Sequence, residues 1–333
     1  MASWRKERLV VRKRILSFIL LGWVLLLIGD RVDELRVYQG AQIAMYTIAL
    51  ASIVLLTGYS GQVSLGNGAM MAVGGYSAAL ALNNFKAPLW LAFIVAIVVA
   101  ALFGALLGAA AARLSGPYLA GTTLALAVGL PAIANQFAFL GGEPGLLFDV
   151  GAPPARFGEE FTQYKWFFWI ASFIALLALF VTSNILRSRF GRTWRAVRGN
   201  TLAAELAGVA SARMKILAFT VSSALAGLAG AVLGMTISLV APGAYSLALS
   251  FSLVTGAVLA GISSLPGVVF GGAILVAIPE ISDALANRLG GADKLNNYLP
   301  GLITSVLLIL SVIYTPNGPG ENLRKHLPKR AAR

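Results

Sequence analysis

The sequence has 333 residues, of which 58% are hydrophobic and only 12% are charged, with a formal net charge of +13. Soluble globular domains carry roughly 25% charged residues, so most of the surface of this chain faces something other than water. The chain has no cysteine, which excludes disulfides, thiolate metal sites and cysteine nucleophiles, and its one histidine, His326, lies in a polar C-terminal stretch and is interpreted as a solvated residue.

Ten apolar runs follow one another along the chain, several of them long enough to cross a hydrocarbon core of ~30 Å. The first follows a basic stretch and is not followed by a small-x-small cleavage site, so we interpret it as an uncleaved span. The fold class predicted is all-α, a polytopic transmembrane helical bundle of about 8–10 spans. The runs are 15–29, 41–57, 66–82, 88–112, 118–140, 166–186, 214–240, 248–263, 265–282 and 298–314.

One interruption qualifies this scheme. Only Ser264 separates the runs 248–263 and 265–282, and Pro266 follows, so we expect a broken helix or a tight hairpin there. Nine crossings with a re-entrant segment are an alternative. In domain terms we predict a basic cytoplasmic tail at 1–14, a single transmembrane domain at 15–314 and a second basic tail at 315–333.

The segment 58–75 contains six glycines and several polar residues, which is unusual for a helix that faces lipid. Irregular backbone at membrane depth is tolerated where it is buried in protein or lines an aqueous cavity. We therefore expect a discontinuous or re-entrant segment near 58–68 whose free amides border a solute pathway; the alternative is a cytoplasmic turn followed by a glycine-packed helix. The candidate pathway residues are Gly58, Gly61, Gln62, Ser64, Asn67, Thr122 and Thr123.

Pairs of small residues four apart recur at Gly104/Gly108, Gly230/Gly234 and Gly267/Gly271. Such pairs let helix backbones approach closely. Packing within the chain is the expected use, and a dimer face is the alternative.

The loop 187–215 carries a second distinctive pattern. Arg192, Arg195 and Arg198 recur every three residues and share one helical face. Asn200 or Thr201 is placed to cap a second short helix, and Gly208 to end it in a left-handed conformation. We predict a short helix-turn-helix whose small residues suit insertion into a groove on another protein, the alternative being a connector that only anchors helix ends.

The distribution of charge predicts the orientation. With the N-terminus in the cytoplasm, the two tails, the loop at Arg113 and the loop 187–215 hold 19 of the 26 basic residues but only three of the 13 acidic ones. Cytoplasmic loops carry such an excess of Lys and Arg. The positive charge is thus explained by the bilayer, and nucleic acid is not an expected partner.

The predicted spans hold almost no ionisable residue. Intramembrane carboxylates and bases mark ion-coupled carriers, and no constellation of catalytic residues is present either, so neither a proton-coupled carrier nor a membrane enzyme is expected. No Gly-Lys-Ser/Thr follows the glycine-rich segment, so the chain lacks a phosphate-binding loop of its own. Energy for transport would then come from a partner.

The residues Ala203-Ala204-Glu205 followed by Gly208 resemble the coupling loop of permeases in ATP-binding-cassette importers. More narrowly, four stretches resemble the LivM-type permeases of branched-chain amino acid importers: Thr57–Ala79, Arg113–Ala127, Gly191–Gly234 and Gly256–Glu280. The sequence departs from that pattern in two places. Gly199-Asn200-Thr201 replaces the charged residues expected there, and Asn67-Gly68 stands where relatives often carry His-Ala.

The resemblance implies a subunit of a bacterial or archaeal cytoplasmic-membrane importer. Its partners would be two cytoplasmic ATPase subunits that bind ATP and Mg²⁺, a second homologous permease and an extracytoplasmic solute-binding protein; this chain would bind no cofactor or metal and would not be an enzyme. The cargo implied is branched-chain or related amino acids, with urea, amides or aromatic acids as alternatives within the family. The competing hypotheses are a stand-alone secondary carrier or channel for a small neutral solute, and a membrane scaffold. The residues expected to couple to the ATPase are Arg192, Arg195, Arg198, Ala203, Ala204, Glu205 and Gly208.

Overall fold

The computed structural model describes residues 32–114, 116–154 and 161–288, together with isolated positions between 18 and 25 and between 302 and 310. Both predicted tails, 1–14 and 315–333, lie outside the described residues, as do most of the predicted spans 15–29 and 298–314. Each of the eight predicted spans between 41 and 282 corresponds to one described helix.

The helices confirm the predicted all-α class. Six of them are long and apolar enough to cross a membrane, and the described residues include only one small sheet, in which β1 pairs antiparallel with β2. In chain order the elements are α2 (Glu34–Ile53), the π-helical turn η1 (Val54–Tyr59), α3 (Asn67–Phe85), α4 (Leu89–Ala111), α5 (Pro117–Gln136), η2 (Ala138–Leu140), β1 (Leu146–Leu147), α6 (Gln163–Arg187), α7 (Arg189–Gly199), α8 (Thr201–Leu206), α9 (Ser211–Ile237), β2 (Leu239–Val240), η4 (Pro242–Tyr245), α10 (Leu247–Ala260) and α11 (Gly267–Arg288).

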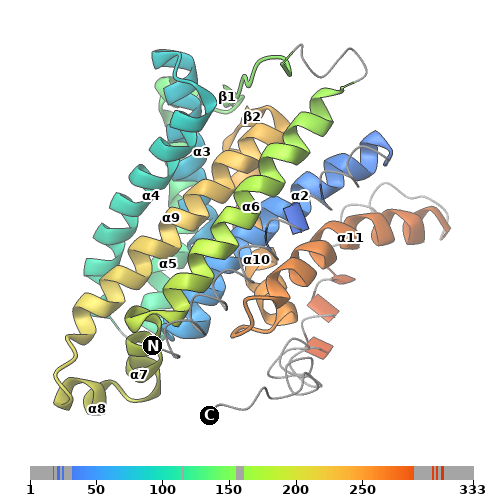
Figure 1. Cartoon of the computed structure of the whole chain (residues 1–333). Helices are drawn as coiled ribbons and strands as arrows, with labels where there is room; N and C mark the ends of the chain where they lie inside the picture. The colour runs from blue at the N-terminus through green and yellow to red at the C-terminus, as the bar shows by residue number, and fades with distance from the viewer. Residues whose placement is uncertain are drawn as a thin grey trace, which may run out of the picture.

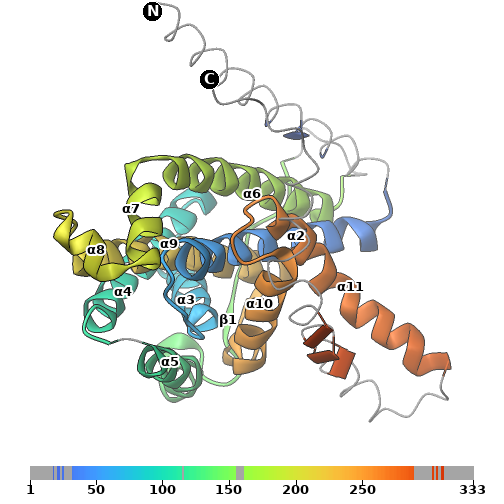
Figure 2. The ribbon, with the colours of Figure 1, turned by 90° about the horizontal axis from the view of Figure 1, so that it is seen from below.

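Two helices form the centre of the bundle. The apolar windows of α2–η1 and α9 are 72% buried, whereas that of α5 is only 22% buried. Helices α3 and α4 pack on α9, and α6 and α11 pack on α2 (Figures 1 and 2). Outer helices such as α4 expose large apolar side chains, including Trp90 and Leu106, which suits a surface covered by lipid.

Glycines bring the central helices into backbone contact. A Cβ at Gly74 of α3 would overlap the backbone of Gly227 in α9, and a Cβ at Gly230 would overlap the carbonyl of Met71. Gly104 and Gly108 of α4 likewise pack on α9. The small-residue pairs predicted from the sequence therefore serve packing within the chain, because a larger side chain would hold these helices apart.

The break between α10 and α11 is a tight hairpin, one of the two alternatives predicted. It spans residues 261–266, wider than the single Ser264 expected from hydropathy. Gly267 packs on the carbonyl of Ala260, and Gly271 packs on the carbonyl of Gly256. These contacts run in opposite directions along the two helices, so α11 returns alongside α10 from the turn.

Candidate functional site

The loop between α6 and α9 folds as the helix-turn-helix predicted from its sequence. The Asn200 side chain accepts a hydrogen bond from the Ala203 amide at 3.0 Å and so caps α8, which settles the choice between Asn200 and Thr201. Gly208 has a φ of +83° and ends the second helix, because glycine adopts this left-handed conformation without strain. Helices α7 and α8 lie together at one end of the bundle (Figure 1).

A buried stripe fixes α7 to the bundle. Gly191, Trp194 and Val197 are buried at spacings of three residues. The indole N–H of Trp194 donates to the carbonyl oxygen of Met214 at 2.9 Å, which ties α7 to the first turn of α9. A displacement of α7 would therefore be passed to α9.

The three predicted arginines lie beside this stripe and are exposed. Arg192 donates to the Arg187 carbonyl, within its own loop. Arg195 lies over the ring of Tyr59, with the guanidinium carbon 5.8 Å from the ring centroid. Arg198 donates to the carbonyl oxygen of Gly58 and to the Ser263 hydroxyl, the latter at 3.1 Å. Two of the three arginines thus contact the broken segment near 58, which the sequence did not predict.

Helix α8 leaves an apolar surface uncovered in the described chain. Leu206 is 91% exposed and Leu202 is 73% exposed, and both lie on a helix of only six residues. Ala203 and Glu205 are also exposed, and Glu205 accepts a hydrogen bond from the Ser211 hydroxyl. Ala204 is buried against the rest of the loop. Of the four loop residues that resemble the family pattern, Ala204 therefore faces the interior, whereas Ala203, Glu205 and Gly208 are exposed.

The chain is interrupted between Tyr59 and Asn67, as predicted. The preceding π-helical turn is a local widening of the helix of the kind that often marks a functional position. Most backbone amides of this break are not free, contrary to expectation. Those of Ser60, Gly61 and Gln62 reach carbonyls of η1, and the Leu65 amide reaches the Thr123 hydroxyl at 3.0 Å.

Several predicted pathway residues make structural contacts. The side-chain amide nitrogen of Asn67 donates a hydrogen bond to the Ser52 hydroxyl at 2.9 Å, in the buried contact between α3 and α2. The Ser64 hydroxyl accepts from the Gly66 amide, and Gly58 packs on the carbonyl of Ile262. Thr122 lies exposed on α5 and bonds to its own helix. Gly61 and Gln62 are the two predicted pathway residues that line a cavity.

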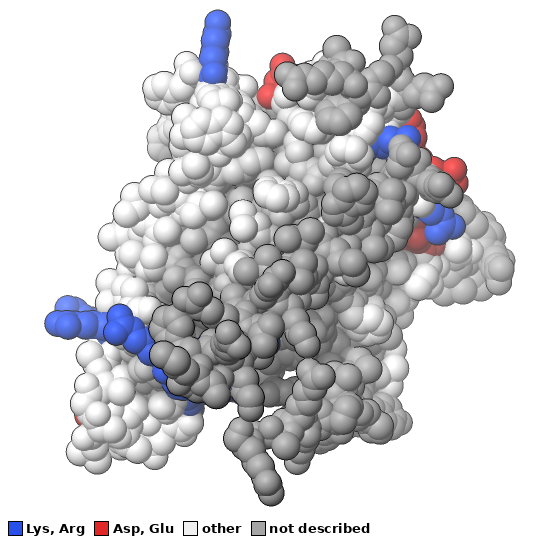
Figure 3. Space-filling view, viewed as in Figure 1, with Lys and Arg blue, Asp and Glu red and all other residues white. Residues whose placement is uncertain are grey.

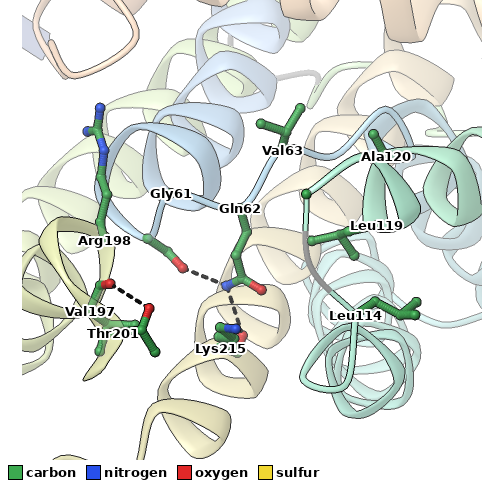
Figure 4. A pocket seen from close by; sticks show the side chains of 12 residues that line it. Gly61, Gln62, Val63, Leu114, Leu119, Ala120, Val197, Arg198, Thr201 and Lys215 are labelled. Carbon is green, nitrogen blue, oxygen red and sulfur yellow. Dashed lines mark hydrogen bonds between the residues drawn. The ribbon is translucent and has the colours of Figure 1, made fainter. Parts of the chain in front are cut away.

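That cavity, of about 370 Å³, lies where the two predicted sites meet (Figure 4). The Gln62 side chain donates to the Ser60 hydroxyl at 2.6 Å and to the Lys215 carbonyl at 3.4 Å. Gly61, with a φ of +74°, packs on the side-chain carbons of Arg198. The lining residues are Ser60, Gly61, Gln62, Val63, Leu114, Gly116, Leu119, Ala120, Val197, Arg198, Thr201 and Lys215.

Sequence reasoning missed Lys215, Thr201 and the apolar wall of the cavity. Lys215 was counted only as one more basic residue of the loop. Leu114 lies between two predicted spans, and Leu119 and Ala120 lie within the predicted span 118–140. No local signal identifies them, because they lie 51 to 155 residues from the break at 60–63 and meet it only through the packing of the folded chain.

The balance of charged side chains differs between the two ends of the bundle. At the α7–α8 end the visible charged side chains are almost all basic, whereas acidic and basic side chains occur together toward the opposite end (Figure 3). Glu205 is the acidic residue of the α7–α8 loop. Among the described residues, no group of three or more His, Cys, Asp or Glu side chains forms a metal-binding cluster.

Comparison with known proteins gives a consistent result. Residues 38–312 match the family described as "Branched-chain amino acid transport system / permease component". The chain is 28% identical over 298 residues to the Escherichia coli K12 high-affinity branched-chain amino acid transport system permease protein LivM, covering 82% of this chain and 67% of that protein. It is 27% identical over 293 residues to BraD of Pseudomonas aeruginosa, which bears the same description and is covered to 90%.

A shorter similarity reaches a second type of permease. The chain is 33% identical over 163 residues to the Escherichia coli K12 permease protein LivH of the same transport system, which covers 49% of each chain. No solved structure matches the chain significantly.

Proposed function

The chain belongs to the family of branched-chain amino acid permease components, and from this premise we propose that it is the membrane-spanning subunit of an ATP-driven importer of branched-chain amino acids. The observation that carries the proposal is the α7–α8 loop, which presents an exposed apolar surface while its other side is tied to the broken segment at 58–66. A loop with these two sides would connect a partner protein, bound at the exposed surface, to the helices of the membrane bundle.

The exposed surface of α8 is suited to an ATPase subunit. Leu202 and Leu206 are four residues apart on one face, and the small side chains of Ala203 and Ala207 allow a partner to approach the backbone. A leucine buried at an interface contributes about 1.5–3 kcal/mol relative to one left in water. The ATPase, with its ATP and Mg²⁺, would dock here.

Motion of the partner would reach the membrane through two connections. Trp194 fastens α7 to α9, one of the two central helices. Arg198 fastens α7 to the carbonyl of Gly58 and to Ser263 in the α10–α11 hairpin. A rigid shift of α7 would therefore act on the central helix and on two broken segments together, which are the elements able to change shape at low cost.

The remaining assignments follow the charge distribution and the relatives. The α7–α8 end would be cytoplasmic, because cytoplasmic loops carry the excess of Lys and Arg. The opposite end, with β1 and β2, would face an extracytoplasmic solute-binding protein. The relatives LivM and LivH are permease proteins of one transport system, which supports a second homologous permease as a partner of this chain.

Uptake of radiolabelled leucine by cells that carry the complete system tests the proposal. Glu205→Lys and Gly208→Trp should abolish ATP-dependent uptake while leaving membrane insertion intact. The first reverses the charge that binds Ser211, and the second places a bulky side chain at a φ of +83°. Uptake at the wild-type rate in both variants would refute the coupling role, and transport by the purified chain alone, driven by a gradient, would favour a secondary carrier.

A further inference from the structure

The cavity between the broken segment and the α7–α8 loop combines an apolar wall with a polar, basic one. Leu114, Leu119 and Ala120, from the α4–α5 region, form the apolar side. Gln62, Thr201 and Lys215 contribute the polar groups, with Arg198 at the edge. Its volume of about 370 Å³ falls within the ~300–1,000 Å³ typical of small-molecule sites.

Gln62, which lines this cavity, has one buried hydrogen-bonding position without a partner in the described structure. Its side chain is 5% exposed, and both donations of its amide nitrogen are accepted within the chain. Its carboxamide oxygen Oε1 is buried and receives no hydrogen bond from the part of the chain that the structure describes. Figure 4 shows that oxygen on the side of the Gln62 side chain that faces Leu119 and Leu114. A buried acceptor without a donor is costly, so this position calls for a donor from a ligand.

The charge of the lining is unbalanced. Lys215 and Arg198 are cationic, and none of the described lining residues carries a carboxylate. Arg198 is engaged by Gly58 and Ser263, whereas the ammonium group of the half-buried Lys215 has no described carboxylate beside it. A ligand that brings both an anionic group and a hydrogen-bond donor would complete the site, because charge-assisted hydrogen bonds are the strong ones.

We propose that this cavity is a binding site for small α-amino acid zwitterions. The ammonium group donates to Oε1 of Gln62, the carboxylate pairs with Lys215, and an aliphatic side chain packs on Leu114, Leu119 and Ala120. The choice of amino acids as the ligand class rests on the proposed function, as does the placement of the site on the cytoplasmic, release side. An occupied cavity would connect the α7–α8 loop to the break and slow its movement, so imported amino acid would inhibit its own uptake.

Equilibrium binding of L-leucine to the purified full chain in lipid nanodiscs tests the site. Three probes separate its chemistry: isopentylamine lacks the carboxylate, 4-methylpentanoate lacks the ammonium group, and inorganic phosphate supplies an anion alone. Nanodiscs with and without anionic lipid show whether a lipid phosphate competes. The expected result is that leucine binds at least about tenfold more tightly than any of the three probes, and that anionic lipid leaves its binding unchanged.

Variants then assign the binding to the cavity. Gln62→Met and Lys215→Met should each weaken leucine binding by about tenfold or more, and Ala120→Trp should block it by filling the space. Arg213→Met, which removes an exposed charge of the same stretch outside the cavity, is the control. Ala120→Trp leaves every polar group in place, so it tests the site even where Gln62→Met fails to fold.

The outcomes separate this inference from the proposed function. Leucine binding that survives both Lys215→Met and Ala120→Trp, or absence of binding to a chain whose complex still imports leucine, overturns the cavity assignment alone. Equal binding of phosphate and leucine, or competition by anionic lipid, overturns the zwitterion as the ligand. If the wild-type complex does not take up leucine, the proposed function is contradicted, whatever the cavity binds.

Discussion

The guanidinium group of Arg198 donates a hydrogen bond to the backbone carbonyl of Gly58, across 140 residues of sequence. The contact joins the surface helix α7 to the point where the first central helix gives way to irregular backbone. A carbonyl near a helix end lacks its usual intrahelical partner, and an arginine supplies a charged donor for it. Arg198 is thereby a direct link between the loop and the break.

Replacing Arg198 by Gln should uncouple the importer. The shorter neutral side chain does not reach Gly58 and Ser263 together, so α7 loses the hydrogen bonds that Arg198 makes to the two broken segments. ATP-dependent leucine uptake should fall by roughly 5- to 150-fold, the range given by a coupling free energy of about 1–3 kcal/mol. ATPase activity and copurification of the subunits should persist. Arg213→Gln, an exposed arginine outside these contacts, is the matched control, and equal uptake by the two variants would contradict the link.

Leu206→Ser should weaken docking of the ATPase without harming the chain itself. The side chain is 91% exposed in the described structure, so its truncation removes no internal packing. Loss of a leucine from a buried interface corresponds to roughly 10- to 100-fold weaker binding. Copurification with the ATPase measures this, and Ala212→Ser, at an exposed position of α9 outside that surface, should leave it intact. If Leu206→Ser retains the ATPase fully, α8 is not the docking surface.

Gly230→Ala should destabilise the bundle. The added Cβ would overlap the carbonyl of Met71, and neither backbone can give way easily. Overpacking of this kind costs about 1–3 kcal/mol, measured as a lower midpoint of denaturation in mixed micelles. Gly121→Ala on α5 is the control, because no described atom lies within 4 Å of its Cβ position. Equal stability of both variants would show that α3 and α9 do not approach so closely.

Asn67→Ala should also lower stability, through loss of its bond to Ser52. Removing one partner of a buried hydrogen bond costs about 1–3 kcal/mol. Because both side chains share this bond, Asn67→Ala and Ser52→Ala should be non-additive in a double-mutant cycle. Additive effects on the free energy of unfolding would leave Asn67 free for the pathway role that its sequence context predicts.

Sidedness can be measured directly, since the chain has no cysteine of its own. A membrane-impermeant maleimide should label Leu147→Cys in whole cells, and should label Ala203→Cys only after permeabilisation. Both positions are exposed, and they lie at opposite ends of the bundle (Figure 1). Labelling of Ala203→Cys in intact cells would place the α7–α8 loop outside and remove the basis for ATPase coupling.

Sequence patterns predicted the features of the fold that depend on residues close together in the sequence. Runs of apolar residues located eight helices that the structure describes, six of them long and apolar enough to cross a membrane, because a helix in a bilayer must be apolar along its length. The cap at Asn200 and the stop at Gly208 were also predicted, since each depends on hydrogen bonds or dihedral angles within a few residues. The hairpin at 261–266 was located but not chosen over a broken helix, because the direction of the second helix depends on what it packs against.

The sequence by itself determined that this chain forms a membrane bundle with a break near 60 and a basic helix-turn-helix at 187–215. Only the tertiary structure decided which residues meet. It turned Asn67 and Ser64 toward structural hydrogen bonds, and it brought Gln62, Arg198 and Lys215 to one cavity. The reason is that helix packing sets contacts between positions far apart in the sequence, through backbone approaches such as those of Gly230 to Met71 and Gly58 to Ile262 that no local pattern encodes.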